Sequence, residues 1–371
     1  MNNSVLILGG YGNFGKKIAH ALVKAGIAVI IAGRDERKAT QLTRQLLQQY
    51  PNISIASSAF DVNKALPAQL ESLKPAVVIN TCGPFQTADY SVASACIAHK
   101  VHYIDLSDGR DFVTGITELD AEAKKMGVLV VSGASTVPGL SSAVLEHYKS
   151  GFSTFDSLKF GISPGAKAPR GLATTQAILT YLGKPLKPCP GSHTKRYGWQ
   201  DIYRQPYPEL GKRWMANCDI PDLDLFPEKY GIKTIQFSAG MESTLLHLGM
   251  WLLSWSVRLG LPLTLEKHAA LLLRLSTLFD SLGTPHGGMH MLIKGTDTQG
   301  KQKEIQWFIV ARDGDGPHIP TIPSIILAKK LCQNAIQQTG AIPCIGLVTL
   351  EEYLAELNSF AVRTFVHEKF M

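Results

Sequence analysis

Val5-Leu6-Ile7-Leu8 runs directly into Gly9-Gly10-Tyr11-Gly12-Asn13-Phe14-Gly15, and this stretch decides the fold. The glycines spell G-x-G-x-x-G between an apolar strand and the helix expected over Lys16 to Lys24. Glycine is required because the turn is tight, a pyrophosphate approaches the backbone, and the helix packs closely on the strand. The unpaired N–H groups at the helix N-terminus then favour phosphate. The pattern predicts a dinucleotide site formed by Gly10, Tyr11, Gly12, Asn13, Phe14 and Gly15.

The end of the second expected strand, Ala28 to Ala32, indicates which dinucleotide binds. An NAD site usually ends this strand with a carboxylate for the ribose 2′-hydroxyl, whereas an NADP site places an arginine near the 2′-phosphate. Arg34 stands at this place, and its planar guanidinium donates paired hydrogen bonds to phosphate. Asp35 beside it has the position of a helix N-cap, which is compatible with that role. We therefore predict NADP(H) as the cofactor.

Strand and helix patterns alternate through the first 150 residues. Most of the strands are continuous apolar runs, as expected of a parallel sheet that is buried on both faces. Six such strands with crossover helices make a complete doubly wound sheet. The expected strands are Val5–Leu8, Ala28–Ala32, Ile53–Ser57, Val77–Asn80, Tyr103–Leu106 and Val128–Ser132.

Ligands of such a sheet lie beyond the carboxyl ends of its strands, so the residues after each strand are candidates for binding. Asp61 and Val62 follow the third strand, where the carboxylate could accept from an adenine amino group or cap the next helix. A glycine-proline turn follows the fourth strand, and we expect it along the pyrophosphate and the nicotinamide ribose. Its predicted cofactor-binding residues are Thr81, Cys82, Gly83 and Pro84.

Three residues are candidates for catalysis. Asp105 and Ser107 end the fifth strand, where they could orient a polar substrate or form a capped, solvated turn. His286 could act as a proton donor near the substrate, with a structural role as the alternative. His286 and His290 have an i, i+4 spacing, but the intervening glycines argue against a helix, and we predict no metal site.

Composition limits the partners and the compartment. The 371 residues carry a net charge of +7, without a nucleic-acid-binding motif, which favours a polyphosphate cofactor and an anionic substrate or membrane surface over nucleic acid. The six cysteines form no C-x-x-C pair, so we expect reduced thiols in a cytoplasmic protein. The N-terminus lacks a basic region ahead of its apolar run, so no signal peptide is predicted.

The second half of the chain contains two apolar helical segments, Leu245–Val257 and Leu265–Phe279. Both fall well short of the roughly 20 apolar residues that a membrane-spanning helix needs. They are expected either as core or dimer helices or as helices in a membrane interface, which would give peripheral membrane contact through residues 245–279. A basic stretch with interleaved aromatic residues, Lys184 to Arg213, is either a solvated surface or a lid that guides an anionic substrate.

Five segments carry a family resemblance: Gly9–Gly15, Ala32-Gly33-Arg34, Asn80–Phe85, His102–Ser107 and Val137-Pro138-Gly139-Leu140. Together they resemble the saccharopine dehydrogenase family, in its saccharopine-reductase-like branch. No tyrosine has a lysine four residues later, so the catalytic pair of short-chain dehydrogenases is missing. The resemblance implies an NADP-binding domain, an α/β substrate domain, a C-terminus that returns to the first domain, and dimers. It also implies substrate-site roles for Arg170 and Arg312.

The sequence thus predicts an α/β protein with a Rossmann-type doubly wound parallel sheet and a second α+β substrate or dimerisation domain. We expect the NADP-binding domain over residues 1–150, with residues 318–371 packing back on it, and the second domain over 151–317. The leading function is hydride transfer between NADP(H) and a small anionic or lipid-like substrate at the cleft between domains. Two alternatives stay open: a membrane- or lipid-associated protein whose nucleotide domain is structural or sensing, and a reductive C–N bond-forming synthase of saccharopine or polyamine type.

Overall fold

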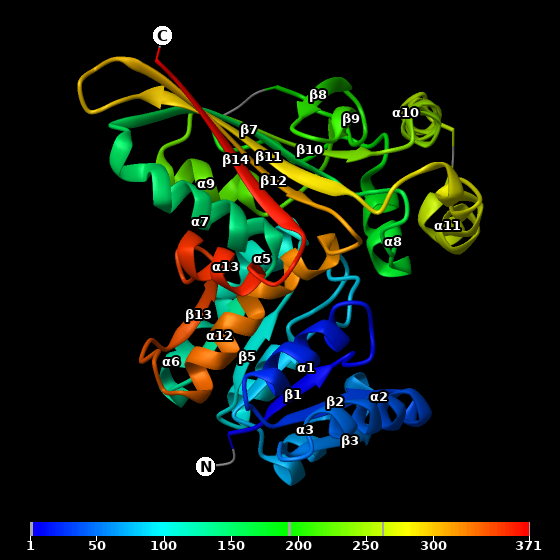
Figure 1. Cartoon of the computed structure of the whole chain (residues 1–371), viewed down its shortest axis with the longest axis vertical. Coiled ribbons are helices and arrows are strands. Elements are labelled where there is room, and N and C mark those ends of the chain that lie inside the picture. The colour runs from blue at the N-terminus through cyan, green and yellow to red at the C-terminus, as the bar shows by residue number, and fades with distance from the viewer. Residues whose placement is uncertain (1–2, 192–193, 262, 371) are drawn as a thin grey trace. The chain divides into compact units, whose positions relative to one another are not determined.

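A computed structural model describes residues 3–191, 194–261 and 263–370. The chain divides into two compact units, and each is discontinuous in sequence. The first unit comprises Met1–Val144 and His318–Glu356, and the second comprises Leu145–Pro317 and Leu357–Met371. Figure 1 shows the chain with its elements labelled. The predicted fold class, a doubly wound parallel sheet with a second α+β domain, is confirmed.

The first unit is built on a parallel sheet of seven strands in the order β13-β6-β5-β4-β1-β2-β3. Short apolar runs form the central strands, and all four residues of β1, β4 and β6 are buried. The order reverses at β1, which places the dinucleotide turn at the switch point where such sheets bind ligands. The strands are β1 (Val5–Leu8), β2 (Val29–Gly33), β3 (Ile55–Ala59), β4 (Val77–Asn80), β5 (His102–Asp105), β6 (Leu129–Ser132) and β13 (Gly340–Pro343).

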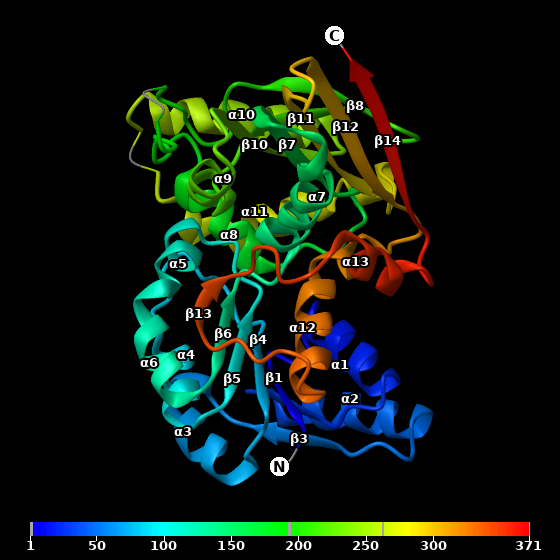
Figure 2. The same ribbon diagram turned by 90° about the vertical axis from the view of Figure 1, so that its left-hand side faces the viewer.

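Helices cover both faces of this sheet. Figure 2 shows α3, α4 and α6 on one side and α1, α2 and α12 on the other. Leu6, Val78 and Val130 pack toward the α3–α4 face, in one cluster with Leu70 and Ile97. The helices are α1 (Gly15–Lys24), α2 (Glu36–Gln49), α3 (Val62–Leu73), α4 (Ser91–Ala98), α5 (Arg110–Gly115), α6 (Asp120–Met126), α12 (Ile322–Cys332) and α13 (Leu350–Leu357), with short turns η1 (Ile116–Leu119), η2 (Thr136–Leu140) and η6 (Gly316–Thr321).

The C-terminal part of the chain contributes to both units. The strand β13 adds a seventh strand beside β6, and α12 packs near α1, β4 and β5. The last strand, β14 (Val362–Phe370), instead pairs with β12 (Gln302–Ala311) in the second unit. Only part of the segment expected over 318–371 therefore belongs to the first unit, because the backbone of β14 pairs with the edge strand β12 of the other sheet.

The second unit has a mixed sheet of seven strands in the order β14-β12-β11-β7-β10-β9-β8. Only β7 and β10 pair in parallel, and the other neighbours are antiparallel. Phe160 on β7 stacks on Phe226 of α9, which covers one face. The remaining strands are β7 (Thr154–Ser163), β8 (Tyr203–Tyr207), β9 (Gly211–Asn217), β10 (Thr234–Met241) and β11 (Gly287–Thr296).

Three helices of the second unit share a hydrophobic cluster at one end of this sheet. The cluster joins α8, α10 and α11 through buried side chains such as Leu179, Trp199 and Ala269. Among the helices in the described ranges, none is both long and apolar enough to cross a membrane. The helices are α7 (Ser141–Tyr148), which begins in the first unit, α8 (Leu172–Tyr181), α9 (Asp222–Tyr230), α10 (Thr244–Arg258) and α11 (Ala269–Thr277), with turns η3 (Lys149–Gly151), η4 (Leu265–His268) and η5 (Asp280–Leu282).

Candidate functional site

The glycine turn after β1 leaves no room for side chains at two of its glycines. A Cβ atom on Gly10 would lie 2.9 Å from the carbonyl oxygen of Ile7, and one on Gly15 would lie 2.7 Å from the Gly10 Cα. The turn is held by hydrogen bonds from Gly10 N to Ala32 O (2.9 Å) and from Gly12 N to Gly9 O (2.8 Å). This compact turn at the start of α1 fits the backbone approach of a pyrophosphate. Tyr11, Asn13 and Phe14 lie in the same turn.

The Tyr11 side chain packs on Gly33 at the end of β2, and Arg34 directly follows this strand. A Cβ atom on Gly33 would lie 2.7 Å from Cζ of Tyr11, so glycine is needed for the tyrosine ring to lie there. The Tyr11 hydroxyl accepts a hydrogen bond from the backbone N–H of Asp35 at 2.9 Å. Asp35 accepts from Lys38 N at 3.2 Å, which confirms its role as the N-cap of α2. Arg34 is exposed at this carboxyl edge of the sheet, where a 2′-phosphate could reach it.

Asp61 and Val62 lie where α3 begins. Asp61 accepts a hydrogen bond from Asn63 N at 3.1 Å, so its side chain caps α3. Both residues are half-buried, and the cap leaves one carboxylate oxygen for other donors. The helix-cap alternative is therefore realised, and binding of adenine by these two residues stays a prediction.

The turn after β4 is tied to the turn after β1. Thr81 Oγ1 donates to the carbonyl oxygen of Leu8 at 2.8 Å, and Asn80 Oδ1 accepts from Cys82 N at 3.0 Å. Desolvation raises the pKa of the Cys82 thiol to about 11, so the thiolate needed of a nucleophile is scarce at neutral pH. Gly83 and Pro84, joined by a cis peptide bond, extend this turn away from the strand. The predicted cofactor residues of β1 and β4 thus form one connected edge.

Asp105 joins the turns that follow β5 and β6. Its Oδ1 accepts hydrogen bonds from Ser107 N (2.9 Å), Ser132 Oγ (3.0 Å) and Gly133 N (2.9 Å). The side chain is fully buried, and this burial raises the pKa of Asp105 to about 6 against those hydrogen bonds. Ser107, also buried, accepts from Gly109 N at 3.1 Å and so shapes the same turn. The structure brings these two predicted catalytic residues together.

The other predicted substrate residues lie in the second unit. His286 Nδ1 accepts from the backbone N–H of Asp313 at 3.3 Å, which fixes the ring beside the strand β11. Arg312 forms an ion pair with Glu209 at 2.9 Å. Arg170 donates to Ser276 Oγ at 2.8 Å and to the carbonyl oxygen of Ala166 at 2.7 Å, and pairs with Asp280. These contacts hold local structure, and substrate binding by the three residues stays a prediction.

A buried polar cluster in the second unit was not predicted. His290 Nδ1 lies 2.8 Å from the Tyr207 hydroxyl, and burial lowers the pKa of His290 to about 3. Lys159 Nζ lies 3.4 Å from the centre of the Tyr203 ring. Tyr203 and Tyr207 come from β8, inside the stretch interpreted as a surface or a lid. The structure instead places this part in the sheet, because side chains of β8 and β9 such as Tyr207 and Met215 are buried. Arg213 on β9 is also nearly buried, and it pairs with Glu242 at 3.2 Å.

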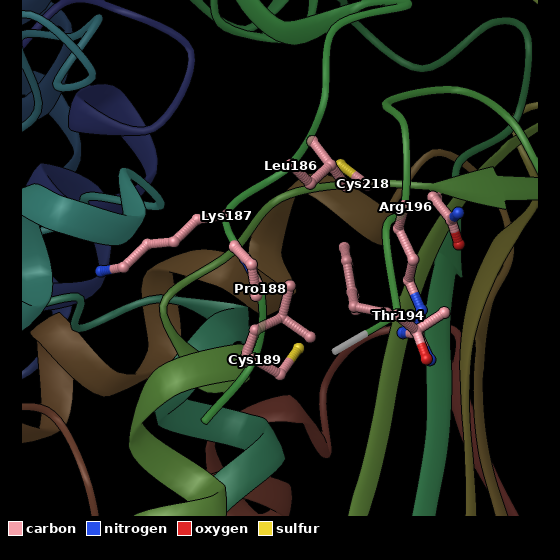
Figure 3. Close-up of a pocket in the computed structure, with 10 residues that line it drawn as sticks. Leu186, Lys187, Pro188, Cys189, Thr194, Arg196 and Cys218 are labelled. Atoms are coloured by element: carbon pink, nitrogen blue, oxygen red, sulfur yellow. The ribbon is translucent and has the colours of Figure 1, made fainter. Parts of the chain in front are cut away.

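A small pocket lies beside the start of this stretch, as Figure 3 shows. Its wall includes Leu186, Pro188 and Phe237, with Arg196 and Cys218 at the side. The guanidinium of Arg196 donates a hydrogen bond to the carbonyl oxygen of Ile235 at 2.7 Å, so its charge is partly satisfied by the protein. In the described ranges, no group of three or more His, Cys, Asp or Glu side chains could hold a metal ion.

The match to a known family concerns the first unit. Residues 5–131 match the model of the saccharopine dehydrogenase NADP binding domain. The resemblance stated from the sequence is confirmed for these residues, and so is NADP(H) as the cofactor of the domain. The residues that surround the glycine turn and Arg34 fit this cofactor, because two of the glycines meet backbone on their inner side and the arginine is accessible.

Three known proteins describe how far the similarity extends. The structure is similar over 98% of its length to apo saccharopine dehydrogenase (L-Glu forming) from Saccharomyces cerevisiae, covering 99% of that chain, with 13% identity and a TM-score of 0.63. At this identity, the similarity concerns the fold. An amine dehydrogenase from Mycobacterium smegmatis aligns over 92% of this chain and 94% of its own, with 13% identity and a TM-score of 0.48. A very-long-chain 3-oxoacyl-CoA reductase from Caenorhabditis briggsae is 31% identical over 68 residues, which are 18% of this chain and 22% of that protein.

Proposed function

We propose that this protein is an NADP(H)-dependent oxidoreductase that transfers a hydride to or from a small substrate, anionic or partly apolar. The reacting bond would be C=N, C=O or an activated C=C. The observation that carries the proposal is the NADP-binding domain over residues 5–131. The cofactor supplies the hydride chemistry when bound, and the protein supplies binding, orientation and electrostatics.

The first unit would hold the cofactor along the carboxyl edge of its sheet. The N–H groups at the start of α1 would bind the pyrophosphate, and Arg34 would pair with the 2′-phosphate. The turn of Thr81 to Pro84 lies beside the glycine turn, since Thr81 donates to Leu8 O. In this proposal the turn positions the nicotinamide ribose, and the neutral Cys82 thiol takes no part as a nucleophile.

Asp105 acts in this proposal as a positioning residue. A fully buried carboxyl that already accepts three hydrogen bonds has little access to a substrate. It instead fixes the turns after β5 and β6, which flank the expected nicotinamide position. Ser107 supports the same turn through Gly109 N. Proton donation to the substrate is left to an accessible group, for which the half-buried His286 is the candidate.

The test is calorimetric titration of NADPH and NADH into the wild type and Arg34→Ala. We expect tight NADPH binding that weakens in the variant by about 1.5–3 kcal/mol, the range for a hydrogen bond to a charged group. NADH lacks the 2′-phosphate, so its affinity should not change. Arg44→Ala, an exposed arginine farther along α2, is the matched control and should bind like the wild type.

NADPH oxidation is then followed with oxo acids, aldehydes and enoyl thioesters. Turnover with one of these classes supports the oxidoreductase. If neither nucleotide binds, the proposal fails. If NADPH binds but no class is reduced, a structural or sensing nucleotide domain explains the data better.

A second candidate is a reductive C–N bond-forming synthase. It is supported by the fold similarity to saccharopine dehydrogenase (L-Glu forming), which extends over both whole chains. It predicts NADPH consumption only when an amine and an aldehyde or oxo acid are supplied together. Equal rates with the carbonyl compound alone would exclude this candidate in favour of simple carbonyl reduction.

A further inference from the structure

The exposed apolar side chains of the described residues gather in one part of the second unit. Ten large apolar side chains are exposed, and eight of them are leucines between residues 245 and 278. Leu259 and Leu278 are the most accessible, at 79% and 71%. Single exposed leucines are ordinary, but a gathering of this kind marks an interaction surface. We call this set the leucine surface: Leu245, Leu252, Leu259, Leu261, Leu263, Leu271, Leu275 and Leu278.

The helix α10 exposes leucines on its outer side, although apolar side chains such as Met250 and Leu253 already pack its inner side against the core. Leu245, Leu252 and Leu259 recur every seven residues on its outer side. His247 and Ser254, also seven residues apart, are fully buried on its inner side. Burying a histidine while exposing leucines costs stability in water. Contact of the outer face with an apolar phase would remove the cost of exposing these leucines to water.

The leucine surface continues from α10 through the connection to α11. Leu261 and Leu263 extend it where the chain leaves α10, and Leu271, Leu275 and Leu278 continue it along and just beyond α11. Both helices lie at one edge of the second unit (Figure 1) and share one hydrophobic cluster with α8. The surface is therefore formed by two neighbouring short helices and the tip that joins them.

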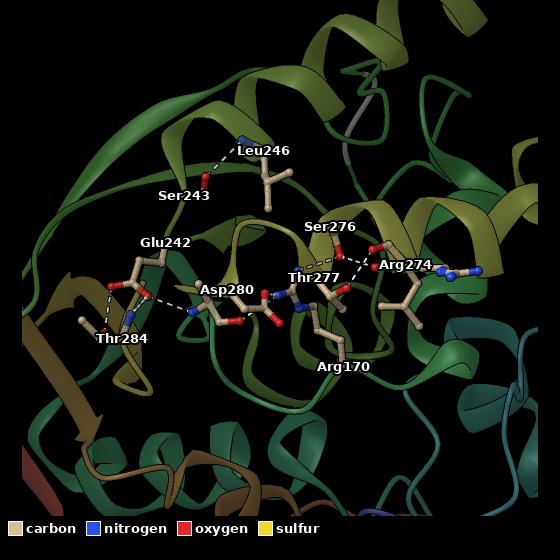
Figure 4. A network of polar contacts seen from close by, with 11 residues as sticks. Arg170, Glu242, Ser243, Leu246, Arg274, Ser276, Thr277, Asp280 and Thr284 are labelled. Carbon is tan, nitrogen blue, oxygen red and sulfur yellow. Dashed lines mark hydrogen bonds and ion pairs between the residues drawn. The ribbon is translucent and has the colours of Figure 1, made fainter. Parts of the chain in front are cut away.

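Polar contacts beneath the helix ends hold this surface in place (Figure 4). Ser243 caps α10 by accepting from Leu246 N at 3.3 Å, and the neighbouring Glu242 accepts from Thr284 N and Ala166 N, both at 2.8 Å. Arg170 bonds to Ser276 on α11 and pairs with Asp280. The leucines are thus presented by anchored helices, which lowers the entropy lost on docking.

Charge around the leucine surface distinguishes between its two plausible occupants. Residues 243–279 contain Arg258, Lys267 and Arg274 but a single acid, Glu266. The acids directly outside this range are each paired with an arginine, Glu242 with Arg213 and Asp280 with Arg170. A second copy docking by a two-fold axis would place this basic set against itself, which is unfavourable. Anionic phospholipid headgroups supply the opposite charge, while the acyl region accepts the leucines. We propose that the leucine surface docks the protein on an anionic phospholipid bilayer without spanning it.

The test is co-sedimentation of the full-length protein with phosphatidylcholine vesicles, with or without phosphatidylserine. We expect binding that requires phosphatidylserine and weakens with salt. Leu259→Ser with Leu278→Ser should reduce the vesicle affinity about a hundredfold, since each buried leucine is worth about tenfold or more. Lys267→Gln with Arg274→Gln should reduce the dependence on phosphatidylserine. Val366→Ser on β14, another exposed apolar side chain of the same unit, is the matched control and should bind like the wild type.

Thermal melting and circular dichroism check that each variant is folded. We expect wild-type values, because the exchanged side chains are exposed. Equal binding to vesicles without phosphatidylserine would overturn the proposal, and so would unchanged binding of the double leucine variant. If sedimentation equilibrium instead shows a dimer that the leucine exchanges dissociate, and vesicles are not bound, a second copy covers this surface. These outcomes are independent of cofactor binding, so the oxidoreductase proposal can stand or fall separately.

Discussion

At the scale of single residues, the glycine turn after β1 and the cap of α2 were predictable because their chemistry is local. A side chain at Gly10 or Gly15 would collide with neighbouring backbone atoms, so only glycine fits at these positions. The role of both residues can therefore be recognised from the sequence motif. The same holds for Asp35, whose capping bond to Lys38 N depends on neighbours three residues away. Asp105 is different, since its partners Ser132 and Gly133 come from the next strand of the sheet. The sequence placed Asp105 at the end of a strand, but it could not predict that the side chain is fully buried.

Asp105→Asn should change how stability depends on pH. Burial raises the pKa of Asp105 from 3.8 to about 6, so the native protein keeps this proton to higher pH than the unfolded chain. Its contribution is therefore present below about pH 4 and is lost as pH rises through 6. Asparagine keeps an acceptor for the three donors and does not ionise. Relative to the wild type, the variant should gain about 2.4 kcal/mol between pH 4 and pH 7.

Denaturant unfolding at several pH values, followed by a signal of the first unit, measures this difference. Glu122→Gln, an exposed carboxylate on α6, is the control and should follow the wild type throughout. A difference between Asp105→Asn and the wild type that stays constant from pH 4 to pH 7 would contradict the shifted pKa.

At the scale of helices and strands, the sequence predicted best those strands that are buried on both faces of a sheet, and it predicted the others poorly. All six strands predicted for the first sheet are present within a few residues, because apolar runs such as Val77–Asn80 are buried on both faces. The strands β8, β9, β10 and β14 were missed. The strand β8 reads Tyr-Arg-Gln-Pro-Tyr, which contains a proline and has no regular alternation of polar and apolar residues, and its pairing depends on β9. No local signal distinguishes such a strand from a surface loop.

The helix α10 was recognised, but which of its faces is inward could not be predicted. Its stripe of His247 and Ser254 would be the solvent side of an ordinary amphipathic helix. In the structure the His247 ring packs on Trp199 with ring centres 5.3 Å apart, and neither ring nitrogen has a hydrogen-bond partner among the described residues. The burial of His247 and Ser254 depends on tertiary packing of α10 against β9, β10 and α8, which the sequence of α10 alone does not reveal.

His247→Leu should therefore stabilise the protein at mildly acidic pH. Burial lowers the pKa of His247 from 6.5 to about 4, so the native state holds a neutral imidazole while the unfolded chain binds a proton. Stability from this group is present above pH 6.5 and is lost as pH falls toward 4. Leucine removes that loss, so the decline in stability from pH 7 to pH 5 should shrink by about 2 kcal/mol.

Thermal unfolding at pH 5 and pH 7 tests this expectation. His268→Leu is the control, because this histidine is exposed and should leave the pH dependence unchanged. A decline in the His247→Leu variant as large as that of the wild type would show that His247 does not titrate as a buried group.

At the scale of the whole molecule, each unit is completed by distant parts of the chain. The sheet of the first unit gains β13 from a segment more than 200 positions after β6, and the backbone N–H of Ala341 donates to Asp120 Oδ1 at 3.0 Å. The sequence predicted the return of the C-terminus only through the family resemblance. Pairing over such separations leaves no pattern in either segment alone, so the ending of the chain in the other sheet was not foreseen.

The first unit should consequently fail to fold from residues 1–144 alone. Nine of the eleven residues of α12 are buried, including Ile325, Leu327 and Leu331. Each buried aliphatic side chain contributes about 1.5–3 kcal/mol, and a domain is stable by only about 5–15 kcal/mol in total. Without α12 and β13, the fragment loses an amount comparable to its whole stability. It should show no cooperative melting and no NADPH binding.

The matched variant joins residues 1–144 to residues 318–356 through a flexible Gly/Ser linker, which restores the first unit without the second. It should melt cooperatively and bind NADPH with an affinity comparable to that of the full chain, because every predicted cofactor residue lies in this unit. Circular dichroism and calorimetry measure both properties. Cooperative melting and NADPH binding by 1–144 alone would show that the returning segment is dispensable. Failure of the joined variant to bind would show that the second unit supplies part of the cofactor site.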